Sequence, residues 1–503
     1  MIPNKSDAIN IFKSMIVLVL FAVPMCGSMV DDSVFEKPVP GIYSEKNSTY
    51  DIEGKINSPR VLTSVRVILN GNGNTVETEC SESGTFCFNG VSPGKYTLVP
   101  ENSGSTFIPE QIQVEISDND CGGLRFDEIV DSWELSGEKG SNQELVSVVR
   151  DGDDFIGVGS ATNGENSEDV FAIRFSKSGY IKWKKYFGVS NNERAVQILK
   201  YDENRMFILK NTVSSETGMD GMNTGIIEID QAGNFTGEKK FGGYNLDEGA
   251  DIVRGPGDTI LITGSTTSYS DSRDIFVSAF DTKCDLIGYH VLKYDGLDTA
   301  VSLTNTEKDD EFMILGRSEM AGMKSVITMI RIRIGSLDMS GSTDKADVVF
   351  RQKLVSEEAE FSSDMIKTSM NEYCITGWAE AMSGKKVTPL LIRTNRYGEL
   401  VDKRKLPCGS DAVYSRIDSL PGGGFSISGF MMKTSGNKDR DAFVSFINNL
   451  GESKIVTDEI STDRDDIAIA SFEIDDNTVM IVGNRYSDGE KAFFVRTLKQ
   501  PER

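Results

Sequence analysis

A pattern of two β-branched runs separated by a polar loop recurs along most of the chain, and it limits the fold more than any other feature. It is clearest in Gly257–Asp281, where Thr259–Thr263 and Ile275–Phe280 flank a loop rich in Ser, Thr and Asp. Alternating, β-branched segments of this length bounded by Gly and Asp are typical of strands. Copies follow one another about every fifty residues, a spacing found in propellers and solenoids. The residues that end the first run are Gly159, Lys210, Gly264, Gly316, Gly377, Gly429 and Gly483.

Each copy supplies four strand-like segments, the number in one blade of a β-propeller. The last copy lacks a fourth segment after Phe493–Leu498, whereas an extra segment, Ser132–Gly137, precedes the first copy. We therefore expect an all-β fold in which this early segment pairs into the last blade and closes a seven-bladed ring. Closure removes the free sheet edges that would otherwise promote aggregation.

The full repeat, with GG, D, A, I, DG, G, D-x-F and D-x-x-G at fixed offsets, is best preserved in Phe241–Cys284 and Asp411–Gly451. It resembles the exported seven-bladed β-propeller repeats of bacteria and archaea (SBBP-like). The resemblance covers about Ser132 to Arg503 and implies a propeller at residues 131–503, outside the cytoplasm. The chain departs from the pattern at Lys210 and Gly225 of the second copy.

Residues 1–28 have the pattern of a secretory signal peptide. Lys5 and Lys13 precede the apolar run Met15–Cys26, and small residues follow it. The run is short for a membrane span, which needs about 20 residues. Three fates remain open: cleavage near Ser28, lipidation of Cys26 in a lipoprotein, and retention as an uncleaved anchor. In each case we expect an exported protein, either extracellular or attached to the cell envelope.

A linker at residues 29–48 leads to alternating strands at residues 49–120. Their core, Gly84–Leu98, reads G-x-F-x-F-x-G, then P-G-x-Y-x-L. It resembles the carboxypeptidase regulatory-like (prealbumin-like) β-sandwich, a small non-catalytic module of exported proteins. The resemblance implies four side chains that point into the core, those of Phe86, Phe88, Tyr96 and Leu98.

Cys80 and Cys87 flank the turn at Gly84, and two interpretations of them remain open. They form a disulfide across a hairpin, as an oxidising compartment allows, or they are two ordinary buried cysteines. The chain has seven cysteines in all, and their spacing matches no zinc pattern of the C-x₂₋₄-C type.

The charge and the histidine content exclude several classes of function. The chain has 53 Lys and Arg against 77 Asp and Glu, a net charge of −24. So acidic a protein repels phosphate backbones, so we expect no nucleic-acid partner. A single histidine, His290, excludes His-rich metal sites and leaves no partnered base for a Ser-His-Asp triad. With no phosphate loop or dinucleotide motif either, the sequence predicts no enzymatic activity and no cofactor.

One acidic feature recurs from copy to copy. A carboxylate precedes each innermost strand at Glu193, Asp247, Asp298, Glu360 and Asp465, while Gln143 and Ala412 hold that place in two other copies. These positions share one face of a propeller with the long loops between second and third strands. One interpretation is that each acid bonds local backbone N–H groups. The other is a channel-mouth site for a cation, calcium or a polyamine.

The preferred function from the sequence is a non-catalytic exported binding or surface protein whose loop face binds a protein or a glycan. The first alternative is a carbohydrate-active hydrolase or lyase that uses paired carboxylates on the propeller face. The second alternative is a structural component of the cell envelope. The long loops contain few aromatic residues, namely Tyr269, Trp378, Phe430 and Tyr486, which favours binding over sugar hydrolysis.

Overall fold

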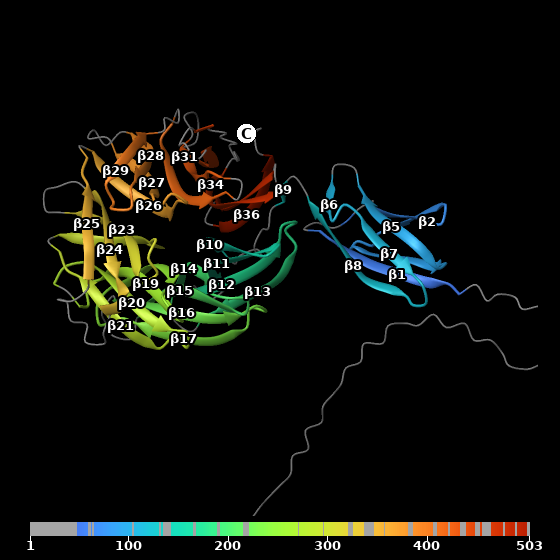
Figure 1. Cartoon of the computed structure of the whole chain (residues 1–503), viewed down its shortest axis with the longest axis horizontal. Coiled ribbons are helices and arrows are strands. Elements are labelled where there is room, and N and C mark those ends of the chain that lie inside the picture. Colours follow the sequence, from blue (N-terminus) through green and yellow to red (C-terminus); the bar gives the residue numbers. More distant parts are fainter. Residues whose placement is uncertain are drawn as a thin grey trace, which may run out of the picture. The chain divides into compact units, whose positions relative to one another are not determined.

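The computed structural model describes residues 48–499 apart from internal gaps, and these residues form an all-β fold (Figure 1). They contain nine four-stranded sheets and a short 3₁₀ helix, η1 (Ile334–Ser336). The predicted signal peptide, Cys26 and almost all of the predicted linker lie outside the described residues. The gaps are residues 59–61, 63–64, 103–104, 130–131, 134–141, 164–166, 189–191, 215–220, 270, 295, 320–324, 337–346, 357, 381–385, 406–409, 421–422, 433–438, 448–452, 455–463, 476–477 and 488–489.

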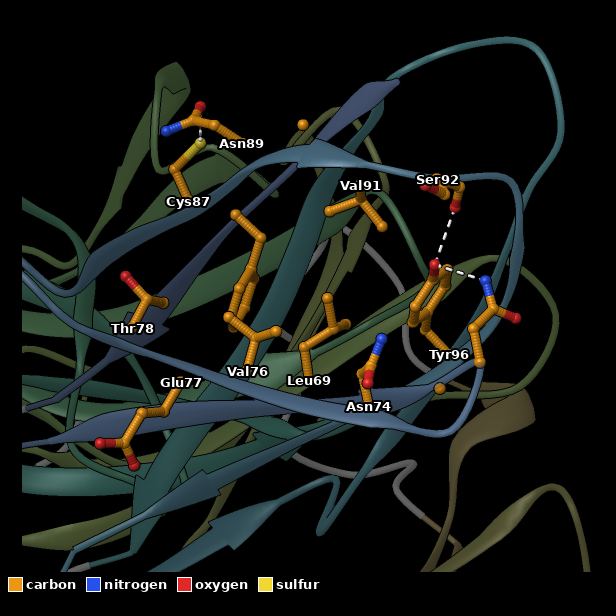
Figure 2. Close-up of a pocket in the computed structure, with 14 residues that line it drawn as sticks. Leu69, Asn74, Val76, Glu77, Thr78, Cys87, Asn89, Val91, Ser92 and Tyr96 are labelled. Carbon is orange, nitrogen blue, oxygen red and sulfur yellow. Dashed lines mark hydrogen bonds between the residues drawn. The ribbon is translucent and has the colours of Figure 1, made fainter. Parts of the chain in front are cut away.

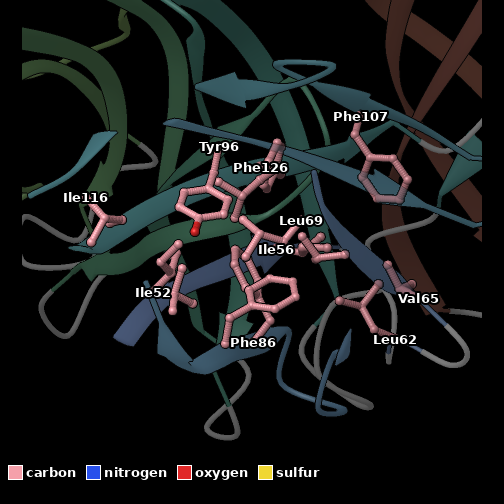
Figure 3. Close-up of a cluster of buried hydrophobic side chains, with 14 residues drawn as sticks. Ile52, Ile56, Leu62, Val65, Leu69, Phe86, Tyr96, Phe107, Ile116 and Phe126 are labelled. Atoms are coloured by element: carbon pink, nitrogen blue, oxygen red, sulfur yellow. The ribbon is translucent and has the colours of Figure 1, made fainter. Parts of the chain in front are cut away.

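Two sheets are formed by residues 50–129, and together they enclose one hydrophobic core (Figure 3). The first has the order β4 (Thr85–Val91), β1 (Tyr50–Asn57), β8 (Cys121–Ile129) and β6 (Thr106–Ile108). The second has the order β3 (Asn74–Glu79), β2 (Arg66–Gly71), β5 (Gly94–Glu101) and β7 (Ile112–Ile116). The four side chains expected in the core, Phe86, Phe88, Tyr96 and Leu98, are all buried there.

This sandwich-like pair of sheets extends past the end that the sequence predicted for it. β8 follows residue 120 and pairs in parallel with β1, from Ile52 opposite Cys121 to Asn57 opposite Asp127. The strand reads CGGLRFDEI, and its two glycines and mixed polarity hide the alternation that marks strands in sequence.

The other seven sheets follow one another along the chain, and each is numbered here by its order. Sheets 1 to 3 consist of β10 (Gln143–Asp151), β11 (Asp154–Asn163), β12 (Ser167–Ser176) and β13 (Ile181–Phe187); β14 (Asn192–Lys200), β15 (Arg205–Ser214), β16 (Gly221–Asp230) and β17 (Phe235–Phe241); and β18 (Asp247–Arg254), β19 (Thr259–Thr266), β20 (Asp274–Asp281) and β21 (Leu286–Leu292).

Sheets 4 to 7 continue the same order of strands. They consist of β22 (Leu297–Asn305), β23 (Glu311–Glu319), β24 (Val326–Arg333) and β25 (Asp347–Leu354); β26 (Ala359–Lys367), β27 (Tyr373–Glu380), β28 (Val387–Thr394) and β29 (Leu400–Lys405); β30 (Ala412–Ser419), β31 (Phe425–Met432), β32 (Arg440–Ile447) and β33 (Ser453–Lys454); and β34 (Asp465–Asp475), β35 (Thr478–Ser487), β36 (Glu490–Lys499) and β9 (Ser132–Trp133).

These sheets close into a ring. A separate hydrophobic cluster lies between each sheet and the next, including one that joins sheet 7 to sheet 1 through residues such as Phe493 and Phe171. Each innermost strand contacts the innermost strands on both sides, and β34 contacts β10. Radial four-stranded sheets packed face to face around an axis form a β-propeller, as Figure 1 shows for β10 to β36.

The predicted pairing of the early strand with the last copy is confirmed. In β9, Trp133 lies opposite Val495 and Ser132 opposite Arg496 of β36. The two paired segments are more than 350 residues apart in the sequence, so their hydrogen bonds join the two ends of the ring non-covalently.

The glycines that recur within the second strands are required by a close backbone approach. A Cβ on Gly377 would collide with the carbonyl oxygen of Phe361 on the neighbouring innermost strand, and Gly159 and Gly429 meet the same obstacle at Glu144 and Val413. We expect Gly377→Ala to lower the free energy of unfolding by about 1–3 kcal/mol, the usual cost of overpacking. Urea unfolding measures it. Gly335→Ala, where a Cβ would meet nothing within 4 Å, is the control, and equal effects at both positions would contradict this account.

Candidate functional site

Each innermost strand of the propeller contains a β-bulge, and the predicted carboxylates lie two positions before it. The bulges fall between Leu145 and Ser147 in sheet 1 and at matching places in the other six sheets. The residues two positions earlier are Gln143, Glu193, Asp247, Asp298, Glu360, Ala412 and Asp466. The prediction for sheet 7 was therefore wrong by one residue: Asp466 is the buried carboxylate, and the half-exposed Asp465 pairs with Arg440.

Most side chains in this column are bound by a cation of the same sheet. In sheets 1, 4 and 5 the cation comes from the outermost strand, and in sheet 7 from the second strand. The pairs are Lys184 with Gln143 (2.7 Å), Arg351 with Asp298 (3.0 Å), Lys403 with Glu360 (2.7 Å) and Arg485 with Asp466 (2.7 Å). Asp247 of sheet 3 instead accepts hydrogen bonds from Thr266 and Ser268, both at 2.6 Å.

In sheet 2 the carboxylate of this column, Glu193, is neutralised by a lysine of the second strand. The outermost strand of sheet 2 carries an acid, Glu238, where sheets 1 and 5 carry lysine. The cation is Lys210, whose Nζ lies 2.6 Å from Glu193 Oε1 and 2.8 Å from Glu238 Oε1, and whose side chain is 1% exposed. Opposite Lys210 stands Gly225, and a Cβ there would press on the lysine side chain at 3.1 Å.

The structure does not bring together the carboxylates of the predicted channel-mouth cation site, Glu193, Asp247, Asp298, Glu360 and Asp465, as free ligands. Four of these carboxylates are buried, and all five are already bound by Lys, Arg, Ser or Thr side chains. Among the residues that the structure describes, no three His, Cys, Asp or Glu side chains are close enough together to hold a metal ion.

Of the two interpretations left open for Cys80 and Cys87, the structure has both as free cysteines, and their side chains lie in different environments. Cys80 follows β3, packs against the core of the N-terminal sheets, and has a pKa that burial raises to about 11. Cys87 lies in β4 between the inward-pointing Phe86 and Phe88, so its side chain points away from that core and donates to Asn89 Oδ1 at 3.1 Å.

A second polar column, four residues after the first, joins neighbouring sheets at the axis. A bulge frees backbone N–H groups, and a buried N–H needs an acceptor. Asp251 of β18 accepts from the N–H of Leu303 in the next sheet at 2.7 Å, and Asp364 of β26 accepts from that of Ile417 at 3.2 Å. The column consists of Ser147, Gln197, Asp251, Ser302, Asp364, Arg416 and Ala470.

Arg416 breaks this column, and Asp418 compensates. An arginine has no acceptor atom, so it cannot take the N–H of sheet 7. Asp418, two residues later on β30, accepts instead from the N–H of Ser471 at 3.2 Å and also accepts from Arg416 Nε at 3.4 Å. Sheets 3, 5 and 6 thus bring three carboxylates and one guanidinium to the axis.

Asp251, Asp364 and Arg416 line an axial cavity of about 190 Å³, and Asp418 lies behind Arg416 as its hydrogen-bond partner. Every innermost strand from β10 to β34 contributes to the wall of this cavity. One side is polar, with Asp251, Ser302, Asp364 and Arg416; the side of sheets 7 and 1 is apolar, with Ile469 and Val146.

Burial raises the pKa of all three carboxyl groups at the axis. Burial raises the pKa of Asp251 to about 6, and the nearby charge of Asp364 adds to this. Burial also raises the pKa of Asp364 and of Asp418, partly offset by the charge of Arg416. For Arg416, burial lowers the pKa, but the three carboxylates outweigh it and the net direction is upward.

We expect Asp251 to make the protein less stable as the pH rises. Its pKa is raised in the folded state, so its contribution is fully present below about pH 4 and is lost as the pH rises through about 6. The difference is on the order of 3 kcal/mol. Urea unfolding at pH 4.5 to 7.5 compares wild type with Asp251→Ser, which keeps an acceptor as Ser147 does in sheet 1. Parallel pH profiles of the two proteins would contradict the expectation.

Two groups of planar side chains lie near the start of the innermost strands, on the face that we call the loop face. In sheets 4 and 5, Phe361 stacks on Trp378 with ring centroids 5.2 Å apart, and Arg317 lies over Phe361 at 5.5 Å. All three are partly exposed.

The second group lies in sheets 6 and 7. The guanidinium of Arg440 lies 5.4 Å from the ring of Phe430 and 5.5 Å from that of Tyr486. The hydroxyl of Tyr486 donates to Glu144 at 2.5 Å, and Lys491 pairs with the other oxygen of Glu144 at 2.7 Å. Trp378 of the first group and Phe430 of the second each directly follow the repeated glycine of their second strand, so these two aromatic residues occupy equivalent positions in sheets 5 and 6.

The N-terminal sheets contain a cavity of their own, of about 460 Å³ (Figure 2). It lies where the edge strands β3 and β4 diverge, and Leu69, Val76 and Val91 line it together with polar groups. Tyr96 closes one end, because its hydroxyl donates to Ser92 O and accepts from Asn72 Nδ2, both at 2.8 Å.

No protein family and no curated protein matches the chain by sequence. Solved structures are similar in fold. A protein of unknown function from Dyadobacter fermentans is 9% identical with a TM-score of 0.42, over 74% of this chain and 99% of that one. The β-propeller domain of the Trilobed protease from Pyrococcus furiosus is 8% identical with a TM-score of 0.41, over 72% and 98%. A puromycin hydrolase is 9% identical with a TM-score of 0.40, over 71% and 53%. The chain contains a β-propeller.

The prediction that the chain is not an enzyme needs correction. The solved structures that are similar to the chain include a puromycin hydrolase and a domain of a protease, so the absence of a catalytic motif in the sequence does not exclude an enzymatic activity. At identities of 8–9% these likenesses concern the fold, and no activity is transferred from them. No helix among residues 48–499, as far as they are described, is long and apolar enough to cross a membrane.

Sequence reasoning found the first polar column and missed the second, which forms the cavity. The signal was present: six of the seven residues four positions after the first column are polar, in strands that are otherwise largely apolar at the inward positions. The bulge shifts these side chains to the axis, and a bulge is not visible in a pattern of strict alternation.

Proposed function

We propose that this chain is an exported binding protein whose propeller binds a protein partner at the loop face. The observation that carries the proposal is the pair of planar groups described above, whose partly exposed members include Trp378, Arg440 and Tyr486. Trp, Tyr and Arg are the residues that contribute most binding energy at protein interfaces. Their ring and guanidinium planes are held in place by stacking, so little side-chain entropy is lost on binding.

The architecture in this proposal is a carboxypeptidase regulatory-like β-sandwich followed by a seven-bladed propeller of the SBBP-like kind. The two four-stranded N-terminal sheets around one core support the first part. The seven successive sheets, with the cluster between sheets 7 and 1, support the second. The signal-like pattern at residues 1–28 supports export, and the net charge of −24 speaks against nucleic acid as the partner.

A photo-crosslinking experiment tests the proposal. The crosslinking amino acid p-benzoylphenylalanine replaces Trp378 or Tyr486 in the full chain, expressed in its native host. As a control it replaces Tyr397, which is 51% exposed in the turn after β28, on the opposite face. We expect one protein to be captured from positions 378 and 486 and not from 397, and Arg440→Ala to reduce its capture at least tenfold.

Two results would contradict the proposal. Equal capture from Tyr397 would show that the loop face has no selectivity. Binding on a glycan array that depends on Trp378, with no protein captured, would assign the same surface to a glycan instead.

A further inference from the structure

The axial cavity differs from the loop face in both chemistry and size, and the proposed function does not use it. A volume of about 190 Å³ corresponds to about six water molecules at liquid density. It therefore suits a small solute rather than a macromolecule.

Arg416 presents unused donors to this cavity. Its Nε donates weakly to Asp418 at 3.4 Å. Among the described residues, its two terminal nitrogens have no hydrogen-bond partner. A guanidinium carries five N–H donors in a planar fork that matches a carboxylate, so four donors remain for a ligand or for water.

The acids across the cavity retain acceptor capacity. Asp364 takes backbone N–H groups of Met365 and Ile417, one on each oxygen, and a carboxylate has about four acceptor sites. Ser302 bridges Asp251 and Asp364, at 3.1 and 3.5 Å. This acidic side is complementary to an ammonium group, and burial, which raises the pKa of Asp251, makes a neighbouring positive charge favourable.

The wall also has apolar parts, beside the polar Gln197, Ser363 and Ser415. Val146, Val301 and Ile469 form these parts and offer no hydrogen bond. A ligand that matched the acids, Arg416 and the apolar side chains would therefore carry an ammonium group, a carboxylate and a short aliphatic part.

We propose that the axial cavity binds a small aliphatic α-amino acid, with its carboxylate on Arg416, its ammonium group between Asp251 and Asp364, and its side chain against Val146 and Ile469. Both charges are needed, because one guanidinium and two carboxylates face each other across the same small space. The site is independent of the loop face, so either proposal can fail without the other.

Isothermal titration calorimetry of the full chain at pH 7.5 tests the proposal with L-leucine, L-valine and L-alanine as probes. Two analogues of leucine each lack one charge: 4-methylpentanoate lacks the ammonium group and isopentylamine lacks the carboxylate. We expect at least one amino acid to bind, and both analogues to bind at least tenfold more weakly than leucine.

Two variants locate the site. Arg416→Gln should weaken binding at least tenfold, whereas Arg205→Gln, which removes an arginine paired with Asp202 at the surface of sheet 2, should not change it. If Arg416→Gln does not fold, the comparison of leucine with its two analogues on the wild-type protein still tests whether both charges of the ligand are required. The proposal is overturned if no amino acid binds at 10 mM, if either analogue binds as well as leucine, or if Arg416→Gln binds as well as wild type.

Discussion

Lys210→Met should lower the free energy of unfolding by about 3–5 kcal/mol, the range measured when one partner of a buried ion pair is removed. The lysine is 1% exposed and lies between Glu193, also 1% exposed, and Glu238. Methionine fills a similar volume but leaves two carboxylates facing each other in a buried space. Glu193 Oε2 lacks a hydrogen-bond partner among the described residues, and the ion pairs of Glu193 and Glu238 within the described residues are the two with Lys210.

A compensated variant separates charge from packing. Sheet 5 has Gly377, Leu390 and Lys403 where sheet 2 has Lys210, Gly225 and Glu238. The triple variant Lys210→Gly, Gly225→Leu, Glu238→Lys installs the arrangement of sheet 5, and we expect it to recover at least half of the lost stability. Lys239→Met, at an exposed ion pair with Asp285, is the surface control and should change stability by less than about 1 kcal/mol. A Lys210→Met protein within 1 kcal/mol of wild type in urea unfolding would refute this account.

Asn484→Ala should be nearly as costly, because it breaks the junction between the last sheet and the first. Asn484 is buried, accepts from Leu145 N at 2.9 Å and donates to Leu145 O at 2.7 Å. Alanine leaves one buried N–H and one buried C=O without partners, at about 1–3 kcal/mol each. We therefore expect a loss of roughly 2–6 kcal/mol in urea unfolding.

Asn211→Ala is the matched control for this junction. Asn211 makes the same two bonds, to Gly249 N at 2.8 Å and Gly249 O at 3.1 Å, between sheets 2 and 3. Those sheets remain joined by the chain, whereas sheets 7 and 1 are held by side chains and by the two residue pairs of β9 with β36. Hydrogen exchange in β10 and β36 should therefore accelerate in Asn484→Ala and stay unchanged in Asn211→Ala. Faster exchange in both variants would show that the junction has no special role.

The repeat was visible in the sequence because the middle strands of each sheet pack against a neighbouring sheet on both faces and are therefore apolar along their length. Their apolar runs and the glycines that the close backbone approach demands recur in register, so the propeller and the pairing of β9 could be predicted. The partners of the carboxylates could not, because Lys403 reaches Glu360 across a sheet from a strand 43 positions later. Nothing in the local pattern around either residue indicates that pairing.

The substitutions at Lys210 and Gly225 show the same limit. In sequence they are two separate departures from the repeat. In the structure they lie opposite each other, and Glu238 on the outermost strand supplies the charge that requires the lysine. The axial cavity escaped prediction for a related reason, since one extra residue in each innermost strand turns Asp251, Asp364 and Arg416 toward a common space.

The axial acceptors bear on how such a chain can evolve. Where the innermost strand carries an Asp or Ser acceptor in the second polar column, its side chain accepts a backbone N–H of the next sheet. Such a sheet can be duplicated or exchanged at little cost, because the backbone N–H of any following copy still has an acceptor. A copy with Arg416 in that place is transferable only together with Asp418. Residues 416 and 418 therefore form one unit, since a copy with arginine at the first position depends on the carboxylate at the second to bind the next sheet.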